Sequence, residues 1–307
     1  MMAKRISAAS QRVHRRWFSR SGVEFSHVPR GQHRCGMTVL ELLVTMGIMS
    51  TLTAVFLPAV QASREAARRT QCVNQLKQIG LALHGYHEQW RSLPAAWQLE
   101  RTGNSQFGWA VPLLPLLEQQ ASSRQVDRGR RLDDPTNSAA RETSIALWLC
   151  PSDIIEPTFV LHEDEELTGS NGPLVTLPTA SYVGVFGVSE PDDFIPAPPG
   201  EGAFEGVRPV RFEEMRRGLT HTLFVGERTM AKVPSTWLGV DVRGEDAVCR
   251  LVGNAATSPN CAVCDECEFD SRHSGGANFL FGDGRVKLVS QSIDSNEYRR
   301  LARRSGP

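Results

Sequence analysis

The chain has 307 residues, enough for one large domain or two ordinary ones, and its 34 basic side chains equal its 34 acidic ones. This balance conceals an asymmetry, because residues 1–36 carry a net charge of +7 and the remaining residues a net charge of −7. The basic segment alone would fit a nucleic-acid-binding tail, but no basic stripe with interleaved aromatic residues follows it. We therefore expect no nucleic-acid partner.

An apolar run follows this basic leader. Residues 37–60 include a single charged side chain, Glu41. As a helix the run would extend about 36 Å, enough to cross a hydrocarbon core of about 30 Å, and it is too long for the core of a cleaved secretory signal. Since basic flanks stay in the cytoplasm, the pattern predicts one transmembrane helix with a cytoplasmic leader and an exported body.

The apolar run continues into an amphipathic segment over residues 61–90. Apolar side chains recur there at spacings of three and four residues, with charged side chains between them. The pattern predicts one long helix that begins in the membrane and ends in a soluble domain. Pro58 is expected to bend this helix without ending it. The recurring apolar positions are Ala62, Ala66, Val73, Leu76, Ile79 and Leu83.

Glu41 is the unusual residue of the predicted span. A carboxylate in hydrocarbon costs several kcal/mol unless it is paired, so an acidic residue inside a span indicates a function. A cut after Gly36 would give Met37 a positively charged amino terminus close to Glu41. A neighbouring copy in an assembly could supply the same charge.

The segment GMTVLE (residues 36–41), with the basic leader and the apolar helix, resembles the prepilin cleavage and methylation motif of type IV pilins and type II secretion pseudopilins. The resemblance implies that a prepilin peptidase cuts after Gly36 and methylates Met37. It also implies an anchor in the lipid of the inner membrane, and a Glu41 that orders copies of this chain or other pilin-like subunits. Two departures are Met37 in place of the usual Phe and a long leader.

Residues 91–294 are predicted to form an exported globular head. Short β-like runs separated by Gly, Pro and Asp clusters indicate an antiparallel sheet with long loops. The runs are PLVTLPTASYVGVFGVS, RPVRF, HTLFVGE, STWLGVDV and ANFLFGDGRVKLVS. The expected fold class is α+β, a long N-terminal helix packed on a loop-rich antiparallel-sheet head, which resembles pilin architecture. Residues 295–307 are expected to form a polar tail.

The head is predicted to end in a β-hairpin over residues 271–290, with Asp283 and Gly284 in its tight turn. The spacing His273-x9-Asp283-Gly284 resembles the C-terminal motif of an uncharacterised exported family with prepilin-type N-termini, once labelled as solute-binding. Further resemblance lies in the segments CVNQLKQIGLALHGYHE, LPLLEQQ, LCPSD and VGE. The resemblance covers most of residues 36–294, and it implies architecture and location rather than a reaction.

His273 and Asp283 admit two interpretations. The hairpin is expected to bring them close together, and His with Asp can bind a metal or transfer a proton. We favour a structural role, because Asp before Gly suits a tight turn and His at a strand entry often bonds to the backbone. Glu227 is expected to form a buried pair with Arg228 or His273.

Seven cysteines are present, and Cys35 lies in the leader. The other six belong to the exported part, where disulfides are expected, with 15 connectivities to choose from. Cys72 and Cys150 lie in two of the family-like segments, and a bridge between them would join the helix to the head. The other four are Cys249, Cys261, Cys264 and Cys267. For these four we favour disulfides over a zinc site of four thiolates.

No cofactor is expected, although acidic residues leave calcium open as a ligand of the head. The oxygens would come from Glu163 to Glu166 or from Asp192 and Asp193, but no spaced D-x-D-x-D loop is present.

Three functional hypotheses follow. The first is a non-enzymatic, pseudopilin-like subunit of a type II secretion or type IV pilus-like assembly. The second is a membrane-tethered solute- or polysaccharide-binding protein, which Trp97, Trp109 and Trp237 in one open groove would favour. The third is a hydrolase, which requires His273 and Asp283 to be exposed together in a cleft.

Overall fold

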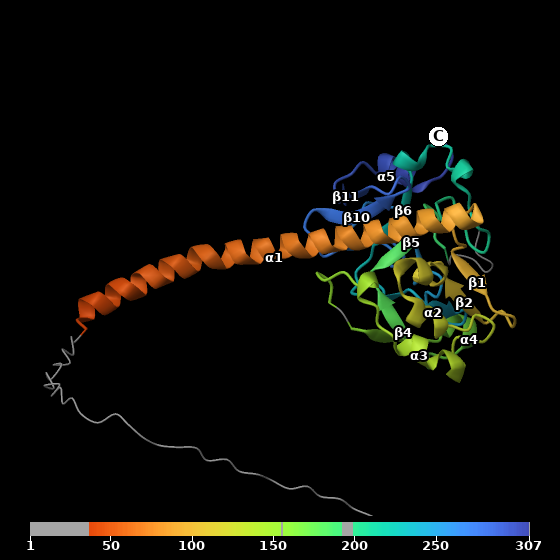
Figure 1. Ribbon diagram of the computed structural model, residues 1–307, viewed down its shortest axis with the longest axis horizontal. Coiled ribbons are helices and arrows are strands. Elements are labelled where there is room, and N and C mark those ends of the chain that lie inside the picture. The colour runs from red at the N-terminus through yellow and green to blue at the C-terminus, as the bar shows by residue number, and fades with distance from the viewer. Residues whose placement is uncertain (1–36, 155, 192–198, 307) are drawn as a thin grey trace, which may run out of the picture. The chain divides into compact units, whose positions relative to one another are not determined.

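The computed structural model describes residues 37–154, 156–191 and 199–306, and it shows a mixed α+β chain (Figure 1). The longest element is helix α1 (Val39–Trp90), which runs through Pro58 without ending. The predicted long N-terminal helix is therefore present. Contacts divide the chain into two compact units between Ala54 and Val55, and the second unit contains the head.

The burial of α1 changes along its length. Every residue from 39 to 63 is exposed, and we call this segment the apolar half. Residues 64–90, the docked half, bury one face in the head. The buried residues are Cys72, Gln75, Leu76, Ile79, Gly80, Ala82 and Leu83. Ala62 and Ala66, which belong to the apolar pattern, are exposed because the buried residues of α1 begin only at Cys72.

Three sheets form the framework of the head. The first has the order β1 (Trp97–Leu99), β2 (Ser105–Gly108) and β8 (Gly239–Asp241). The second has the order β3 (Thr158–His162), β4 (Pro173–Ala180) and β7 (Ser235–Thr236). The third has the order β11 (Val286–Ser290), β10 (Gly276–Phe281), β6 (Leu223–Glu227), β5 (Tyr182–Gly187) and β9 (Val252–Asn254).

The expectation of a purely antiparallel sheet is wrong for the largest sheet. Strand β9 pairs parallel to β5, because a long crossover connects them instead of a tight hairpin. The segment RPVRF, expected as a strand, belongs to none of the sheets. Pro209 has no N–H to donate to a ladder, and the carbonyl of Val210 instead accepts a hydrogen bond from the Leu93 N–H at 2.7 Å.

Short helices connect the strands, and one more follows the last strand. The α-helices are α2 (Gln120–Arg124), α3 (Ser138–Glu142), α4 (Glu165–Thr168) and α5 (Ser295–Ala302). The 3-10 helices are η1 (Val111–Leu117), η2 (Pro135–Asn137), η3 (Ala146–Trp148), η4 (Phe212–Glu214) and η5 (Leu219–His221).

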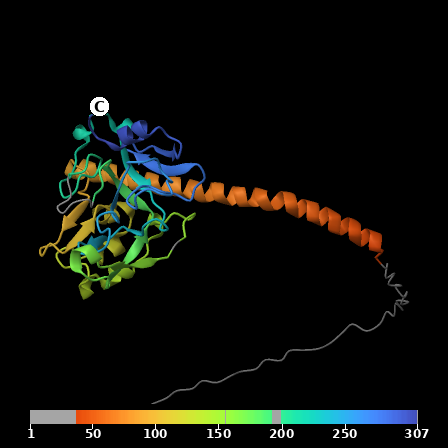
Figure 2. The same ribbon diagram turned by 180° about the vertical axis from the view of Figure 1, so that it is seen from behind.

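Two helices cover the two faces of the largest sheet. Tyr182 and Phe186 of β5 share a buried cluster with Leu76 of α1, whereas Val183 of β5 shares a second cluster with Tyr298 of α5. This division follows from the alternation of side chains along a strand. Figure 1 and Figure 2 show α1 and the C-terminal elements beside this sheet from opposite sides.

The predicted polar tail, residues 295–307, contains a helix that was not expected, because α5 covers residues 295–302. Asp294 caps this helix, because its Oδ1 accepts hydrogen bonds from the backbone N–H groups of Asn296 and Glu297, both at 3.0 Å. Tyr298 and Ala302 lie one turn apart on the same face, and both are fully buried. The sequence is polar on average, but these two positions suffice to pack one face.

Candidate functional site

The predicted processing site lies at the edge of the described chain. Gly36 falls outside the described residues, and Met37 is exposed. Glu41 lies in the first turn of α1. Its Oε2 accepts hydrogen bonds from the backbone N–H of Thr38 at 2.8 Å and from the Thr38 hydroxyl at 3.0 Å. The Glu41 N–H is in turn 3.3 Å from the Thr38 Oγ1.

This reciprocal arrangement is a capping box, in which Thr38 is the cap and Glu41 the third helical residue. Sequence reasoning missed it, although Thr-x-x-Glu before an apolar run is the signature of such a cap. In the uncut chain, Glu41 therefore has donors within its own turn. After a cut behind Gly36, the new amino group of Met37 would lie one residue from this cap.

The expectation that the hairpin brings His273 and Asp283 together is wrong. Asp283 lies in the turn between β10 and β11, whereas His273 precedes β10 at the opposite end of that strand. The hairpin turn contacts α1 through His84, whose Nε2 is 2.8 Å from the carbonyl oxygen of Gly282. His273 contacts α1 at Glu65. These two positions on α1 are about 28 Å apart at a rise of 1.5 Å per residue.

His273 instead belongs to a buried cluster. Its side chain is almost fully buried, and its Nδ1 lies 2.7 Å from Oε1 of Glu65 in the docked half of α1. Its Nε2 faces two other groups, the Cys150 Sγ at 3.5 Å and the Glu227 Oε1 at 3.5 Å. The imidazole is thus fixed by one carboxylate and directed at a thiol and a second carboxylate.

The fourth member of this cluster is Cys72 in α1. Its Sγ lies 2.7 Å from the Sγ of Cys150, and both cysteines are buried and free. The two cysteines are thus adjacent, and neither forms a disulfide in the structure. The bridge expected between the helix and the head therefore remains a prediction, and its two sulfur atoms are adjacent.

We call Cys72, Cys150, Glu227 and His273 the clamp cluster. Their ligand atoms all lie within 4.8 Å of one another. Four separate segments supply them: α1, the loop after η3, the end of β6 and the loop before β10. Thiol, imidazole and carboxylate groups are the ligand types that zinc takes in proteins. Sequence reasoning considered a Cys72–Cys150 pair and a Glu227–His273 pair, but it missed that the two pairs meet, because they are far apart in the chain.

Glu227 is held in place by groups around the cluster. Its Oε2 accepts hydrogen bonds from the Ser271 hydroxyl at 2.9 Å and from the backbone N–H of Asn278 at 2.8 Å. The Asn278 side-chain amide donates to Oε1 at 3.0 Å. Since Oε1 also faces the imidazole, the sequence-based choice between Arg228 and His273 as the partner of Glu227 is decided for His273.

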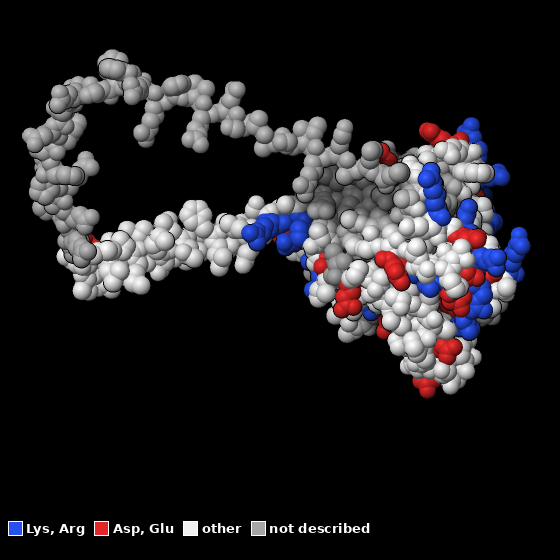
Figure 3. Space-filling view, turned by 60° about the horizontal axis from the view of Figure 1, so that its bottom comes forward, with Lys and Arg blue, Asp and Glu red and all other residues white. Residues whose placement is uncertain are grey.

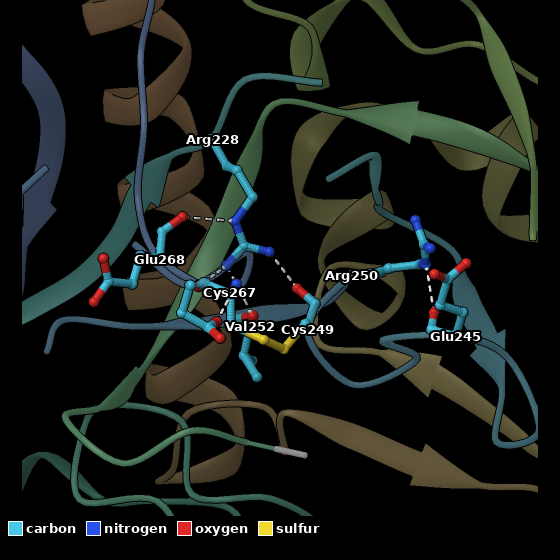
Figure 4. Close-up of a disulfide and its surroundings, with 8 residues drawn as sticks. Arg228, Glu245, Cys249, Arg250, Val252, Cys267 and Glu268 are labelled. Carbon is cyan, nitrogen blue, oxygen red and sulfur yellow. Dashed lines mark hydrogen bonds between the residues drawn. A yellow bond between two sulfur atoms is a disulfide. The ribbon is translucent and has the colours of Figure 1, made fainter. Parts of the chain in front are cut away.

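The neighbouring Arg228 points to a different group of residues. Its buried guanidinium donates hydrogen bonds to backbone carbonyls around a disulfide between Cys249 and Cys267 (Figure 4). The acceptors are the carbonyl oxygens of Cys249, Val252, Cys267 and Glu268. Consecutive side chains at the end of a strand point in opposite directions, so Glu227 and Arg228 serve two separate sites.

The pKa values of the clamp cluster reflect its burial and its hydrogen bonds. Burial opposes the charged imidazole, but the acceptors Cys150, Glu227 and Glu65 outweigh burial and raise the pKa of His273 to about 10. Burial also opposes the charged form of Glu65, yet hydrogen bonds from His273, Arg68 and Ser152 lower the pKa of that carboxyl. The contact with Cys72, followed by burial, raises the pKa of the Cys150 thiol.

Comparison with known families gives a match over most of this chain. The family described as "Protein of unknown function (DUF1559)" matches residues 61–296. The chain belongs to this family. The DUF1559 match includes the docked half of α1, all three sheets and the whole clamp cluster, and it begins just after the predicted span. No curated protein and no solved structure matches the chain.

Within the DUF1559 region, the four late cysteines form two disulfides. Cys249 pairs with Cys267, and Cys261 pairs with Cys264. The preference for disulfides over a zinc site at these four residues is consistent with this pairing. The sequence could not select the pairing, because six exported cysteines allow 15 connectivities.

The remaining predicted ligand residues serve local structure or lie outside the described chain. Asp164 caps α4, because its Oδ1 accepts hydrogen bonds from the backbone N–H groups of Glu166 and Leu167. Asp192 and Asp193 fall outside the described residues. Calcium binding by either segment remains an untested expectation. Trp97, Trp109 and Trp237 are buried in the core and form no open groove.

Proposed function

We propose that this DUF1559 chain is a non-enzymatic, pilin-like subunit, made as a precursor that is cut after Gly36 and anchored in the inner membrane by α1. The observation that carries the proposal is the exposure of the apolar half. Its large apolar side chains are about half to three-quarters exposed, including Leu40 at 72% and Val55 at 69%. A helix that is apolar all round is stable only in lipid or among other apolar helices.

The charges on α1 support the same placement. Between residues 39 and 63 the only charged side chain is Glu41, and basic side chains follow at Arg64, Arg68 and Arg69. Figure 3 shows this nearly uncharged length of the helix followed by a group of basic side chains. Arginines at the end of a span extend their charged groups to the lipid headgroups while their stems stay in apolar surroundings.

Glu41 supplies the proposed assembly device. In the uncut chain its carboxylate caps its own helix through Thr38. A free amino group on Met37, of the same chain or of a neighbouring subunit, would add a charged partner to a carboxylate that otherwise enters hydrocarbon with neutral donors only. Pairing with a full positive charge favours the ionised carboxylate more than neutral donors do.

Mass spectrometry of the mature N-terminus tests the proposal directly. We expect the chain isolated from its native host to begin at an N-methylated Met37, and Gly36→Ala to retain the leader. Glu41→Ala should lose its co-assembly with pilin-like subunits. Gly47→Ala is the matched control for Gly36→Ala, because it replaces glycine by alanine within α1 at a site with nothing within 4 Å of the added Cβ. If processing, membrane localisation and assembly all survive Gly36→Ala and Glu41→Ala, the proposal is wrong.

A second candidate, tethered binding of an acidic solute or polysaccharide, has one supporting observation. A surface pocket is lined by Trp90, Arg91, Arg208, Arg211, Arg216 and Arg304, together with glutamates. Two of these arginines are engaged, since Arg208 pairs with Glu205 and Glu214 and Arg304 pairs with Glu205. Binding of an acidic oligosaccharide that disappears in Arg91→Ala with Arg216→Ala would favour this candidate, and no binding by the wild-type chain would remove it.

A further inference from the structure

We infer that the clamp cluster is a zinc site that fastens the docked half of α1 to the head. The inference is independent of the proposed function, because it concerns residues of the docked half and of the head and not the apolar half. It rests on four convergent ligand groups, on their burial, and on the groups that hold two of them in position.

The ligand set fits zinc. Cys72 and Cys150 offer sulfur, His273 offers Nε2 and Glu227 offers Oε1, and each of these residues is buried. Zinc binds thiolates at about 2.3 Å, imidazoles at about 2.0–2.1 Å and carboxylates at about 2.0–2.2 Å, in tetrahedral geometry. Calcium and magnesium prefer oxygen ligands only, so the two sulfur atoms exclude them.

Two of three distances between ligand atoms agree with a shared ion. Around one tetrahedral zinc, a sulfur and an imidazole nitrogen would lie about 3.6 Å apart, and the nitrogen and an oxygen about 3.4 Å apart. The Cys150–His273 and His273–Glu227 distances are both 3.5 Å. The two sulfur atoms, at 2.7 Å, would have to separate by about 1 Å, which a rotation of one cysteine side chain supplies.

Two ligands are held by residues that surround the site. Glu65 lies 2.7 Å from Nδ1 of His273, so the neutral imidazole donates its proton there and leaves Nε2 as an electron-pair donor. Ser271 and Asn278 hold the Glu227 carboxylate. Carboxylates that orient a ligating histidine and hydrogen bonds that fix a ligating carboxylate are typical of metal sites.

The proposed site is structural. All four positions of a tetrahedral ion are filled by protein groups, which leaves no open position for a water or a substrate. The four ligands come from α1, from the loop after η3, from β6 and from the loop before β10, so a single ion would tie the helix to the core of the head. Binding displaces the two thiol protons and the Nε2 proton of the His273 imidazolium to solvent, because zinc takes thiolates and a neutral imidazole.

The test measures the metal content of the full-length chain, produced with added Zn²⁺ and purified in detergent. No reductant is used, because a reductant would open the two late disulfides. We expect one zinc per chain by elemental mass spectrometry, and loss of that zinc in Cys72→Ser and in His273→Gln. Cys261→Ser with Cys264→Ser is the control and should keep it. Cobalt in place of zinc should give the absorption of a four-coordinate thiolate complex.

Glu65→Gln tests the positioning of His273 separately. We expect zinc affinity, measured by competition with a chelator, to fall about 10- to 100-fold while the stoichiometry stays the same. Wild-type chain that carries no bound zinc after purification would overturn the inference. A Cys72–Cys150 disulfide in the peptide map of the natively isolated chain would also overturn it. Neither result depends on whether a variant folds.

Discussion

The two halves of α1 belong to one helix but differ in the burial and the charge of their side chains. In the apolar half every side chain is exposed and only Glu41 is charged, whereas the docked half is polar on one face and buried on the other. A single backbone geometry thus suits two surroundings, because a helix satisfies its own backbone hydrogen bonds in either. What differs is where the apolar side chains lie: all round the first half and along a stripe in the second.

The largest expected effect comes from placing charges on the apolar half. Ile48→Arg with Leu52→Arg should oppose membrane insertion by about 5–7 kcal/mol, because each arginine near the centre of a span costs about 2.5–3.5 kcal/mol. Membrane fractionation should show the variant shifted to the soluble or degraded fraction. The matched control is Gln78→Arg with Leu81→Arg, at exposed positions of the docked half. Equal behaviour of the two double variants would contradict the division of α1.

A smaller effect is expected from shortening one buried side chain of the docked half. Leu76→Ala removes a fully buried side chain and should lower the free energy of unfolding of the head by about 2–5 kcal/mol. Leu43→Ala makes the same change at a residue that is 62% exposed and should alter that free energy by less than about 0.5 kcal/mol. Denaturant unfolding in detergent, followed by tryptophan fluorescence, measures both. A similar loss from both variants would show that the apolar half also supports the head.

The smallest effect is expected from adding a single methyl group to a glycine in each half of α1. At Gly80 an added Cβ would lie 2.8 Å from the Cδ1 of Leu280, a buried residue of β10, so Gly80→Ala should destabilise the head by about 1–3 kcal/mol through overpacking. Gly47→Ala has nothing within 4 Å and should leave thermal unfolding unchanged or slightly improved, since Ala suits a helix better than Gly. A neutral Gly80→Ala would mean that α1 and β10 pack less closely than this distance requires.

The contacts with α1 also change the interpretation of the His-x9-Asp-Gly spacing. Its two ends contact α1 at separate places, His273 at Glu65 and the turn at His84 through the Gly282 carbonyl. Strand β10 lies between them and packs Leu280 against Gly80. The motif therefore acts as two attachments of one hairpin to the docked half, and not as a pair of residues that act on one ligand.

The sequence by itself determined the long helix, its change from all-round apolar to amphipathic, and the hairpin at the end of the head. Each is a local pattern, in which residues a few positions apart report the same surroundings. The Thr38 cap of Glu41 was equally local and could have been found. Only the tertiary structure decided the parallel pairing of β9 with β5, the burial of Tyr298, and the meeting of Cys72, Cys150, Glu227 and His273. Those contacts join segments tens of residues apart, and periodicity carries no information about which distant segments will share a core.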